Sequence, residues 1–414
     1  MSDVQRLAPT PPRPPQAVRR PPLDGIRVAD FSRIFAGPLC SMTLGDLGAD
    51  VVKIEPPGGD EARGFGPPWL GGEGMNFMAL NRNKRSIALD LKSAGGREAA
   101  LRLAAEADIV IENFRPGVAE RLGIGWEELS AANPGLLYCS ISGFGRKGPN
   151  SARPALDLVL QGASGVLDRQ GRGGPPQMVV ITIADCYAAA LAVQALLAAL
   201  IARSRDGIGQ RVEVTLYEAM LAAQAYRIVS PAGDEPQLPA ASDIAPYGAF
   251  ETVDGWITLA IVTDRSWDAF CRSLDLDELG ADARLATNAG RVEHQDEVVA
   301  RVASALRGRS TRELLGTLEA AGVPCGPVTR VEDLFFDEHV LENEIIVELE
   351  HPSAGRMWTL GVPFAMAGTP LSIRRPAPRL GEHSREVLAE LGYDEGQIDR
   401  VLRETAPVGD LEGA

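Results

Sequence analysis

Short runs of β-branched and aliphatic residues alternate with helical patterns along the first half of the chain. The runs that predict strands lie at 26–30, 51–55, 86–91, 108–113 and 136–142. Helical patterns fall between these runs, at 38–48, 95–107 and 126–132. Strands separated by helical stretches are typical of right-handed βαβ units. The pattern therefore predicts an α/β fold with a parallel sheet.

The stretch 178–202 is long and apolar enough to imitate a membrane span, with Asp185 and Gln194 as its only strongly polar residues. It is rich in alanine, which is weakly hydrophobic, and an acid inside lipid is costly. We therefore predict a buried helix at about 185–203. A strand at 211–216 and a helix at 217–228 are predicted to follow.

Composition changes at 230–248, which is rich in proline and reads as a loop. The next residues, 247–261, predict a hairpin that turns around 253–255. Helical patterns then continue to about residue 321. We expect residues 230–330 to form a separate, smaller α+β domain.

Charge and cysteine content narrow the function. The 414 residues include 41 Lys and Arg against 56 Asp and Glu, a net charge of −15. This disfavours nucleic acid or an anionic membrane as the main partner, although a small basic patch for a phosphorylated ligand is compatible with it. The five cysteines form no CxxC pair, and the N-terminus has no apolar signal segment. We expect a cytoplasmic protein with reduced thiols and a flexible tail over 1–22.

Several common catalytic motifs are absent. The sequence has four histidines, none in an HExxH pattern, and no GxSxG, so we predict no metal site and no α/β-hydrolase. Residues 143–148 match GxGxxG after a predicted strand. A dinucleotide site also needs a helix there, but Pro149 and Pro154 follow instead. A turn or a substrate-lining loop fits this segment better.

Two local features could carry chemistry. Asp185 interrupts a long apolar run, either as the N-cap of the helix or as a carboxylate nucleophile that could attack a carbonyl carbon. A helix N-terminus would favour the ionised form of such a carboxylate, and partial burial would remove its water. The cluster at 81–85, Asn-Arg-Asn-Lys-Arg, could be a solvated loop or could meet the phosphates of a nucleotide-like ligand.

A series of ordered segments over residues 23–400 resembles the class III CoA-transferases, the CaiB/BaiF family that includes formyl-CoA transferase. The matching segments include ADFSRIFAGPLCSMTLGDLGADVVKIEPPGGDEAR (29–63), NRNKRSIALDLK (81–92), DIVIENFRPGVAERLG (108–123), NPGLLYCSISGFGRKGP (133–149), ADCYAAALAVQALLAALIARSRDGIGQRVEVTL (184–216), YGAFETVDGWITLA (247–260), AGVPCGPV (321–328) and APRLGEHSREVLAELGY (377–393).

The resemblance implies a Rossmann-like large domain built from both chain ends, residues 23–229 and 331–414, around the small domain at 230–330. It also implies an interlaced homodimer. The family's catalytic aspartate falls on Asp185, which would exchange CoA between an acyl-CoA and a carboxylic acid through an aspartyl-CoA thioester. CoA would be a substrate rather than a permanently bound cofactor. The family's CoA contacts map onto Ala36, Leu89, Lys92, Asn113, Phe114 and Arg121.

The sequence departs from relatives at four places. Phe35 stands where formyl-CoA transferase has a glutamine, and Pro56 replaces an arginine. The glycine-rich loop of that enzyme would fall within 232–245, which has no glycine run. Leu156 replaces a histidine of the related α-methylacyl-CoA racemases, so a two-base racemase lacks one base. A racemase-like isomerase and a non-catalytic acyl-CoA-binding homologue are the alternatives to a CoA-transferase.

Overall fold

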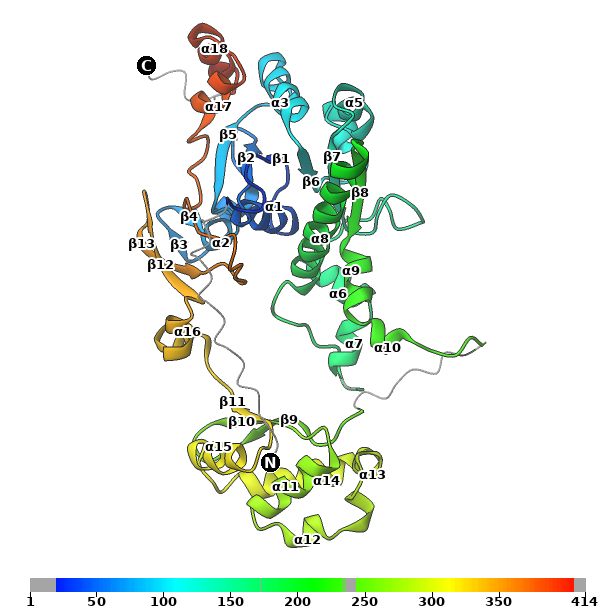
Figure 1. The fold of residues 1–414 in the computed structure, drawn as a ribbon. Helices are drawn as coiled ribbons and strands as arrows, with labels where there is room; N and C mark the ends of the chain where they lie inside the picture. The colour runs from blue at the N-terminus through cyan, green and yellow to red at the C-terminus, as the bar shows by residue number, and fades with distance from the viewer. Residues whose placement is uncertain (1–19, 172, 234, 236–242, 406–414) are drawn as a thin grey trace, which may run out of the picture. The chain divides into compact units, whose positions relative to one another are not determined.

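The computed structural model describes residues 20–171, 173–233, 235 and 243–405, so most of the predicted 1–22 tail and much of the 232–245 segment lie outside the described residues. The contacts divide the chain into two units (Figure 1). One takes in the described residues up to Ala223 and from Asn343 onward, and the other is Gln224–Glu342. The sequence had placed the inserted domain at 230–330.

A six-stranded parallel sheet forms the centre of the larger unit, in the order β5-β2-β1-β6-β7-β8. Its strands are β1 (Arg27–Asp30), β2 (Asp50–Glu55), β5 (Lys84–Ala88), β6 (Ile109–Glu112), β7 (Leu137–Ser142) and β8 (Gln210–Thr215). This is the doubly wound order, in which the chain moves outward from β1 in one direction and then in the other. All six strands agree with the predicted runs to within a few residues.

Helices cover both faces of this sheet (Figure 1). On one face lie α1 (Ala36–Asp46) and α8 (Ile183–Asp206), and on the other α3 (Ala94–Glu106), α5 (Trp126–Ala132), α17 (Ser384–Glu390) and α18 (Glu395–Thr405). Side chains alternate between the faces, so Val28 packs under α1 and α8 whereas Ala29 packs toward α3. Because both faces of the sheet are buried, the sequences of its strands are continuous apolar runs.

Helix α8 is the only one in the described part of the chain that is long and apolar enough to cross a membrane by length and composition. Its buried side chains, among them Ala188, Ala192 and Leu196, pack in the same core as strands of the sheet. The expectation of a core helix at about 185–203 is therefore confirmed, with two more residues at the N-terminal end and three more at the C-terminal end.

The predicted helix at 217–228 is two helices. Helix α9 (Leu216–Ala223) ends before Gln224, and α10 (Ala225–Ile228) follows. Gln224 leaves the helical region, with φ −107° and ψ 11°. The apolar pattern continues across this residue, so it did not reveal the break.

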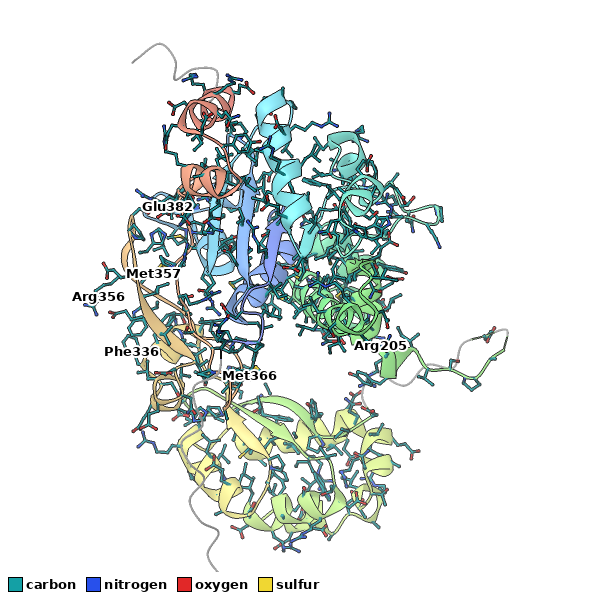
Figure 2. All side chains as sticks on the ribbon, turned by 45° about the horizontal axis from the view of Figure 1, so that its top comes forward. Arg205, Phe336, Arg356, Met357, Met366 and Glu382 are labelled. Atoms are coloured by element: carbon teal, nitrogen blue, oxygen red, sulfur yellow. The ribbon has the colours of Figure 1, made fainter. Side chains whose placement is uncertain are left out.

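Smaller elements complete the larger unit. They are η1 (Glu61–Gly64), β3 (Trp69–Leu70), β4 (Glu73–Gly74), α2 (Met75–Leu80), α4 (Val118–Leu122), α6 (Asp157–Ala163), α7 (Val166–Gly171), β12 (Ile346–His351) and β13 (Gly355–Leu360). Strands β12 and β13 form an antiparallel hairpin. In Figure 2 the consecutive β13 side chains Arg356 and Met357 point to different sides, in keeping with an exposed arginine and a buried methionine.

The second unit has an antiparallel sheet in the order β11-β10-β9, packed with helices. Its elements are α10, β9 (Tyr247–Glu251), β10 (Trp256–Ala260), α11 (Asp264–Ser273), α12 (Asp277–Gly280), η2 (Ala283–Leu285), α13 (Asn288–Glu293), α14 (Gln295–Leu306), α15 (Thr311–Ala320), β11 (Cys325–Pro327), η3 (Val331–Phe336) and α16 (Glu338–Glu342). The predicted hairpin at 247–261 is confirmed. Trp267 and Phe270 of α11 stack in the core of this second unit.

Candidate active site

The loops that follow the parallel strands converge at one edge of the large sheet. Strands β1 and β6 are neighbours there, although their chain connections run in opposite directions along the sheet. This switch point is where doubly wound sheets bind ligands. A cavity of about 150 Å³ opens at this edge. It is lined by residues after β1 (Ile34, Phe35, Ala36), after β6 (Asn113, Phe114, Arg115, Pro116) and around the end of β7 (Ile141, Ser142, Gly143, Phe144), and by Ser151, Arg153, Ala155, Leu156, Asp185 and Leu216.

Among the described residues, Asp185 is the only acidic one that lines this cavity. It is the third residue of α8, whose N-cap is Thr182, so the N-cap interpretation of Asp185 is wrong. A backbone N–H in the first turn of α8 is instead hydrogen-bonded by a side chain from another helix. Asp157, the first residue of α6, accepts a hydrogen bond from the Ala184 N–H at 2.7 Å and another from Gln161 Nε2 at 2.6 Å. Asp185 is therefore left to face the cavity.

The surroundings of Asp185 raise the pKa of its carboxyl to about 7. Burial is the main cause, because it removes water from the ionised form, and the negative charge of Asp157 adds to it. A hydrogen bond from the backbone of Ala36, at the start of α1, acts in the opposite direction. The carboxyl is thus more basic than an ordinary aspartate, yet it still ionises near neutral pH.

The loop between β1 and α1 is held in an unusual conformation. Ile34 has a φ of +69°, which is strained for a β-branched residue. Its N–H donates to Asp60 at 3.1 Å, and Asp60 is paired in turn with buried Lys53 at 2.8 Å. Arg33 and Asn113 exchange two hydrogen bonds of 2.8 and 2.7 Å, which join the loops after β1 and β6. These contacts fix the position of the Ala36 N–H.

Five of the six predicted CoA contacts line two hollows at this sheet edge. Ala36, Asn113 and Phe114 line the Asp185 cavity. Leu89, Lys92 and again Phe114 line a second hollow of about 110 Å³, together with Pro56 and Arg33. Phe114 therefore belongs to both. Arg121, on α4, lines neither of them.

The basic cluster at 81–85 is neither a solvated loop nor a phosphate site. Arg82 pairs with Asp46 of α1 at 2.7 Å, Lys84 with Asp30 of β1 at 3.2 Å, and Arg85 with Asp50 of β2 at 2.6 Å. All five residues of the cluster are buried. These partners lie 35 to 54 residues away in sequence, and Arg85 also pairs with Glu386 and Glu390 of α17, so the local pattern could not show them. The cluster joins β5 to the rest of the sheet and to α1.

The GxGxxG segment at 143–148 leads into turns, and the next helix, α6, begins at Asp157. Gly143 and Phe144 line the Asp185 cavity, so the expectation of a substrate-lining loop fits the structure better than a dinucleotide site. Arg146 pairs with Glu120 and Glu213. Leu156 also lines the cavity, at the position where the racemases carry histidine.

Sequence reasoning missed Asp157 and two cationic side chains of the cavity, Arg115 and Arg153. Asp157 carries no motif of its own. Its role depends on the packing of α6 against the start of α8, where its hydrogen-bond partner Ala184 lies 27 residues later. Within the described part of the chain, no group of three or more His, Cys, Asp or Glu side chains could hold a metal ion.

A doubly wound sheet with a carboxylate of raised pKa at its switch point defines an α/β enzyme site that could act on a carbonyl substrate. Residues 23–384 match the sequence model of CoA-transferase family III. The chain belongs to this family and is a CoA-transferase.

Similar proteins match over nearly the whole chain. The succinate–glutarate CoA-transferase of Agrobacterium fabrum is 38% identical over 385 residues, covering 90% of this chain and 96% of that protein. The succinyl-CoA:mesaconate CoA-transferase of Haloarcula marismortui is 37% identical over 389 residues, covering 90% and 97%. Among solved structures, a CaiB/BaiF family protein from Brucella suis superposes with a TM-score of 0.79 at 36% identity, covering 90% of this chain and all of that one.

Proposed function

We propose that this CoA-transferase moves CoA between dicarboxylic acids of four or five carbons, and that the transfer passes through a covalent intermediate on Asp185. The observation that carries the proposal is Asp185, the one acid among the described residues on the wall of the switch-point cavity, with its raised pKa. The similar enzymes named above act on succinate or succinyl-CoA with glutarate or mesaconate, and these names support the substrate class.

The chemistry proceeds in two half-reactions. An Asp185 oxygen attacks the thioester carbonyl carbon, and the C–S bond breaks to give a mixed anhydride and CoA thiolate. The thiolate then attacks the Asp185 carbonyl carbon, which releases the donor acid as a carboxylate and leaves an aspartyl-CoA thioester. The acceptor carboxylate repeats these two steps in reverse, so Asp185 is restored and no redox partner is needed.

The described residues suit this chemistry in two ways. The Ala36 backbone hydrogen bond holds the Asp185 carboxyl in place, as a nucleophile that forms two successive bonds requires. Phe35, Phe144 and Leu156 give the cavity apolar walls, which reduce hydrolysis of an anhydride or a thioester. At about 150 Å³ the cavity is smaller than a whole ligand site, typically about 300–1,000 Å³. It would hold the reacting end of the substrate.

The CoA moiety would then extend past Phe114 into the second hollow, where Leu89 and Lys92 lie. Phe114 lines both spaces, which supports a path from one to the other along this side chain. Ala36 and Asn113 would contact CoA nearer the thioester, and Arg121 would contribute from α4. No permanently bound cofactor is part of this proposal.

We also propose that the enzyme is a homodimer of interlaced chains in the cytoplasm. Large apolar side chains beside the site are exposed in the single chain, including Val180 at 84%, Ile181 and Met178. An anhydride or a thioester on Asp185 needs shielding from water, and exposed side chains do not provide it in one chain. A second copy that covers these side chains would supply the shielding. The five free cysteines fit a reducing compartment.

Substitution of Asp185 tests the covalent route. Asp185→Asn keeps the shape but removes the nucleophile, so CoA transfer from succinyl-CoA to glutarate should fall at least about 1,000-fold. Borohydride added to the wild-type enzyme with succinyl-CoA should reduce the thioester and mark the peptide that contains Asp185. Asp206→Asn, at the other end of α8, is the matched control and should keep full activity. A label on another residue, or substantial turnover by Asp185→Asn, would show that the route is wrong.

A further inference from the structure

The Asp185 cavity has two cationic side chains on its wall, Arg115 and Arg153. Neither makes an ion pair with a carboxylate in the described part of the chain. Other arginines at this sheet edge are paired, such as Arg33 with Glu61 and Arg63 with Glu55. In a chain with fifteen more acids than bases, unpaired arginines at a cavity leave positive charge available to an anionic ligand.

Arg153 is held in place by its own loop. Its backbone N–H donates to the Asn150 carbonyl at 2.9 Å, and its Nη1 donates to Asn150 Oδ1 at 3.2 Å. The guanidinium carbon lies 5.5 Å from the centre of the Phe144 ring, within range of a cation–π contact. The remaining guanidinium N–H groups retain the planar fork that pairs with a carboxylate through two hydrogen bonds.

The same loop is tied to the helix that carries Asp185. It ends at Leu156, and the next residue, Asp157, accepts the Ala184 N–H at the start of α8. The hydrogen bond between Asp157 and Ala184 therefore joins the segment that carries Arg153 to the segment that carries Asp185. This favours a fixed spacing between the reacting carboxylate and the cation.

Arg115 comes from the loop after β6, whereas Arg153 comes from the loop before α6. Arg115 directly follows Phe114, which the Asp185 cavity shares with the second hollow, where the CoA moiety is proposed to pass. The acyl group, attached at the thioester, must extend away from that path. Arg153 then remains as the cation available to the far end of a short acyl chain.

We propose that Arg153 is the specificity-determining residue that binds the distal carboxylate of the dicarboxylic substrate, so that the enzyme prefers diacids over neutral acids of equal size. This inference rests on the proposed function. A carboxylate in a partly apolar cavity is costly unless a charged donor compensates it. An uncharged acyl group gains nothing from the arginine and leaves it solvated.

The test compares glutarate with its half-amide, glutaramate, as acceptors. The two acids have the same shape and differ in the charge at the distal end. In a two-step exchange, kcat/KM for the acceptor depends only on the half-reaction that starts from the CoA-loaded enzyme. A substitution that affects only the reaction with the donor acyl-CoA therefore leaves this value unchanged. Four enzymes are measured: wild type, Arg153→Gln, Arg153→Lys and Arg115→Gln, with thermal melting as a check of folding.

We expect wild type to prefer glutarate, and Arg153→Gln to lose about 10- to 100-fold in kcat/KM for glutarate, as expected for a lost charge-assisted hydrogen bond. Its kcat/KM for glutaramate should change less than about threefold, since the half-amide has no charge to lose. Arg153→Lys should lie between wild type and Arg153→Gln, because it keeps the charge without the fork. Arg115→Gln should retain the wild-type preference.

Three results would overturn the inference. These are equal use of both acceptors by wild type, an equal fall in kcat/KM for both acceptors in Arg153→Gln, and loss of the preference in Arg115→Gln instead. Failure of wild type to use glutarate at all, with transfer to other acids intact, would overturn the substrate class as well. The Asp185 route would still be judged separately by the borohydride label.

Discussion

Asp185 is in a costly position for a carboxylate. Burial and the charge of Asp157 raise its pKa from 3.8 to about 7, so the folded protein favours the protonated form more than the unfolded chain does. The unfolded chain loses this proton near pH 4, whereas the folded chain keeps it until about pH 7. Stability from this group is therefore present at low pH and is lost as the pH rises through this window. The shift sets an upper bound of about 4 kcal/mol on that loss.

Asp185→Asn should for this reason stabilise the protein while it removes activity. The amide stays neutral at every pH, so the variant avoids the cost of an ionised carboxyl in the site. Its Tm should exceed that of wild type by a few degrees at pH 8, and by less at pH 5. Differential scanning calorimetry at the two values measures this. Equal Tm differences at pH 5 and pH 8 would mean that the pKa of Asp185 is that of an ordinary aspartate.

The sequence identified a functional residue of the site only where the neighbouring residues in the chain made it stand out. Asp185 interrupts an apolar run, and that signal identified it without structural knowledge. Asp157 and Arg153 gave none, since each acts through packing that joins α6, the preceding loop and α8. The cluster at 81–85 was misinterpreted for the same reason, because its acidic partners come from distant strands and from α1.

Among the elements, helix α1 does most to position the site, because its first residue, Ala36, hydrogen-bonds Asp185. Its second residue, Gly37, lies against the preceding loop. A Cβ there would come within 2.1 Å of the Ser32 Cβ, and 3.6 Å from Asn113. Ser32 in turn donates its backbone N–H to buried Asp30 at 2.9 Å, so it has little freedom to move away. Only glycine fits this close approach.

Gly37→Ala should displace the start of α1 and with it the Ala36 N–H. We expect a loss of about 1–3 kcal/mol in the free energy of unfolding, typical of overpacking, and a loss of CoA transfer of at least about tenfold. Urea unfolding and a transfer assay give the two values. Gly58→Ala is the control, since nothing lies within 4 Å of its added Cβ. Wild-type behaviour of Gly37→Ala would show that the loop yields easily.

Element prediction succeeded where periodicity and burial agree. The strands of the large sheet are buried on both faces, which produces the apolar runs that located them. The break at Gln224 was missed because apolar residues continue past it in the sequence, although none of the α10 residues is buried. The strand order was not readable from the pattern alone, since it depends on which strands pair.

Considered as a whole molecule, the single chain leaves apolar surface uncovered near its active site. Leu158 and Val159 of α6 are exposed beside the segment with Val180 and Ile181. Exposed apolar side chains gathered in this way are typical of an interface. If two chains interlock there, folding and dimerisation cannot be separated.

Light scattering should therefore give the mass of two chains at every concentration at which the enzyme is active. Val180→Asp should reduce the dimer fraction and activity together, because it places a charge in the proposed interface. Val253→Asp, at the exposed tip of the β9–β10 hairpin, should change neither. A stable, active monomer on dilution would exclude the interlaced arrangement.

The return of the C-terminal helices to the large unit has a consequence for how the protein is made. Helices α17 and α18 share a core with α3 and the sheet, so that face stays open until these two helices have been synthesised and have left the ribosome. About 180 residues separate Ala223 from the end of α18, roughly 10–35 s of synthesis. During this interval the nascent chain exposes the apolar side of α3. Translation speed and chaperone supply should therefore affect the yield of this protein more than its equilibrium stability would suggest.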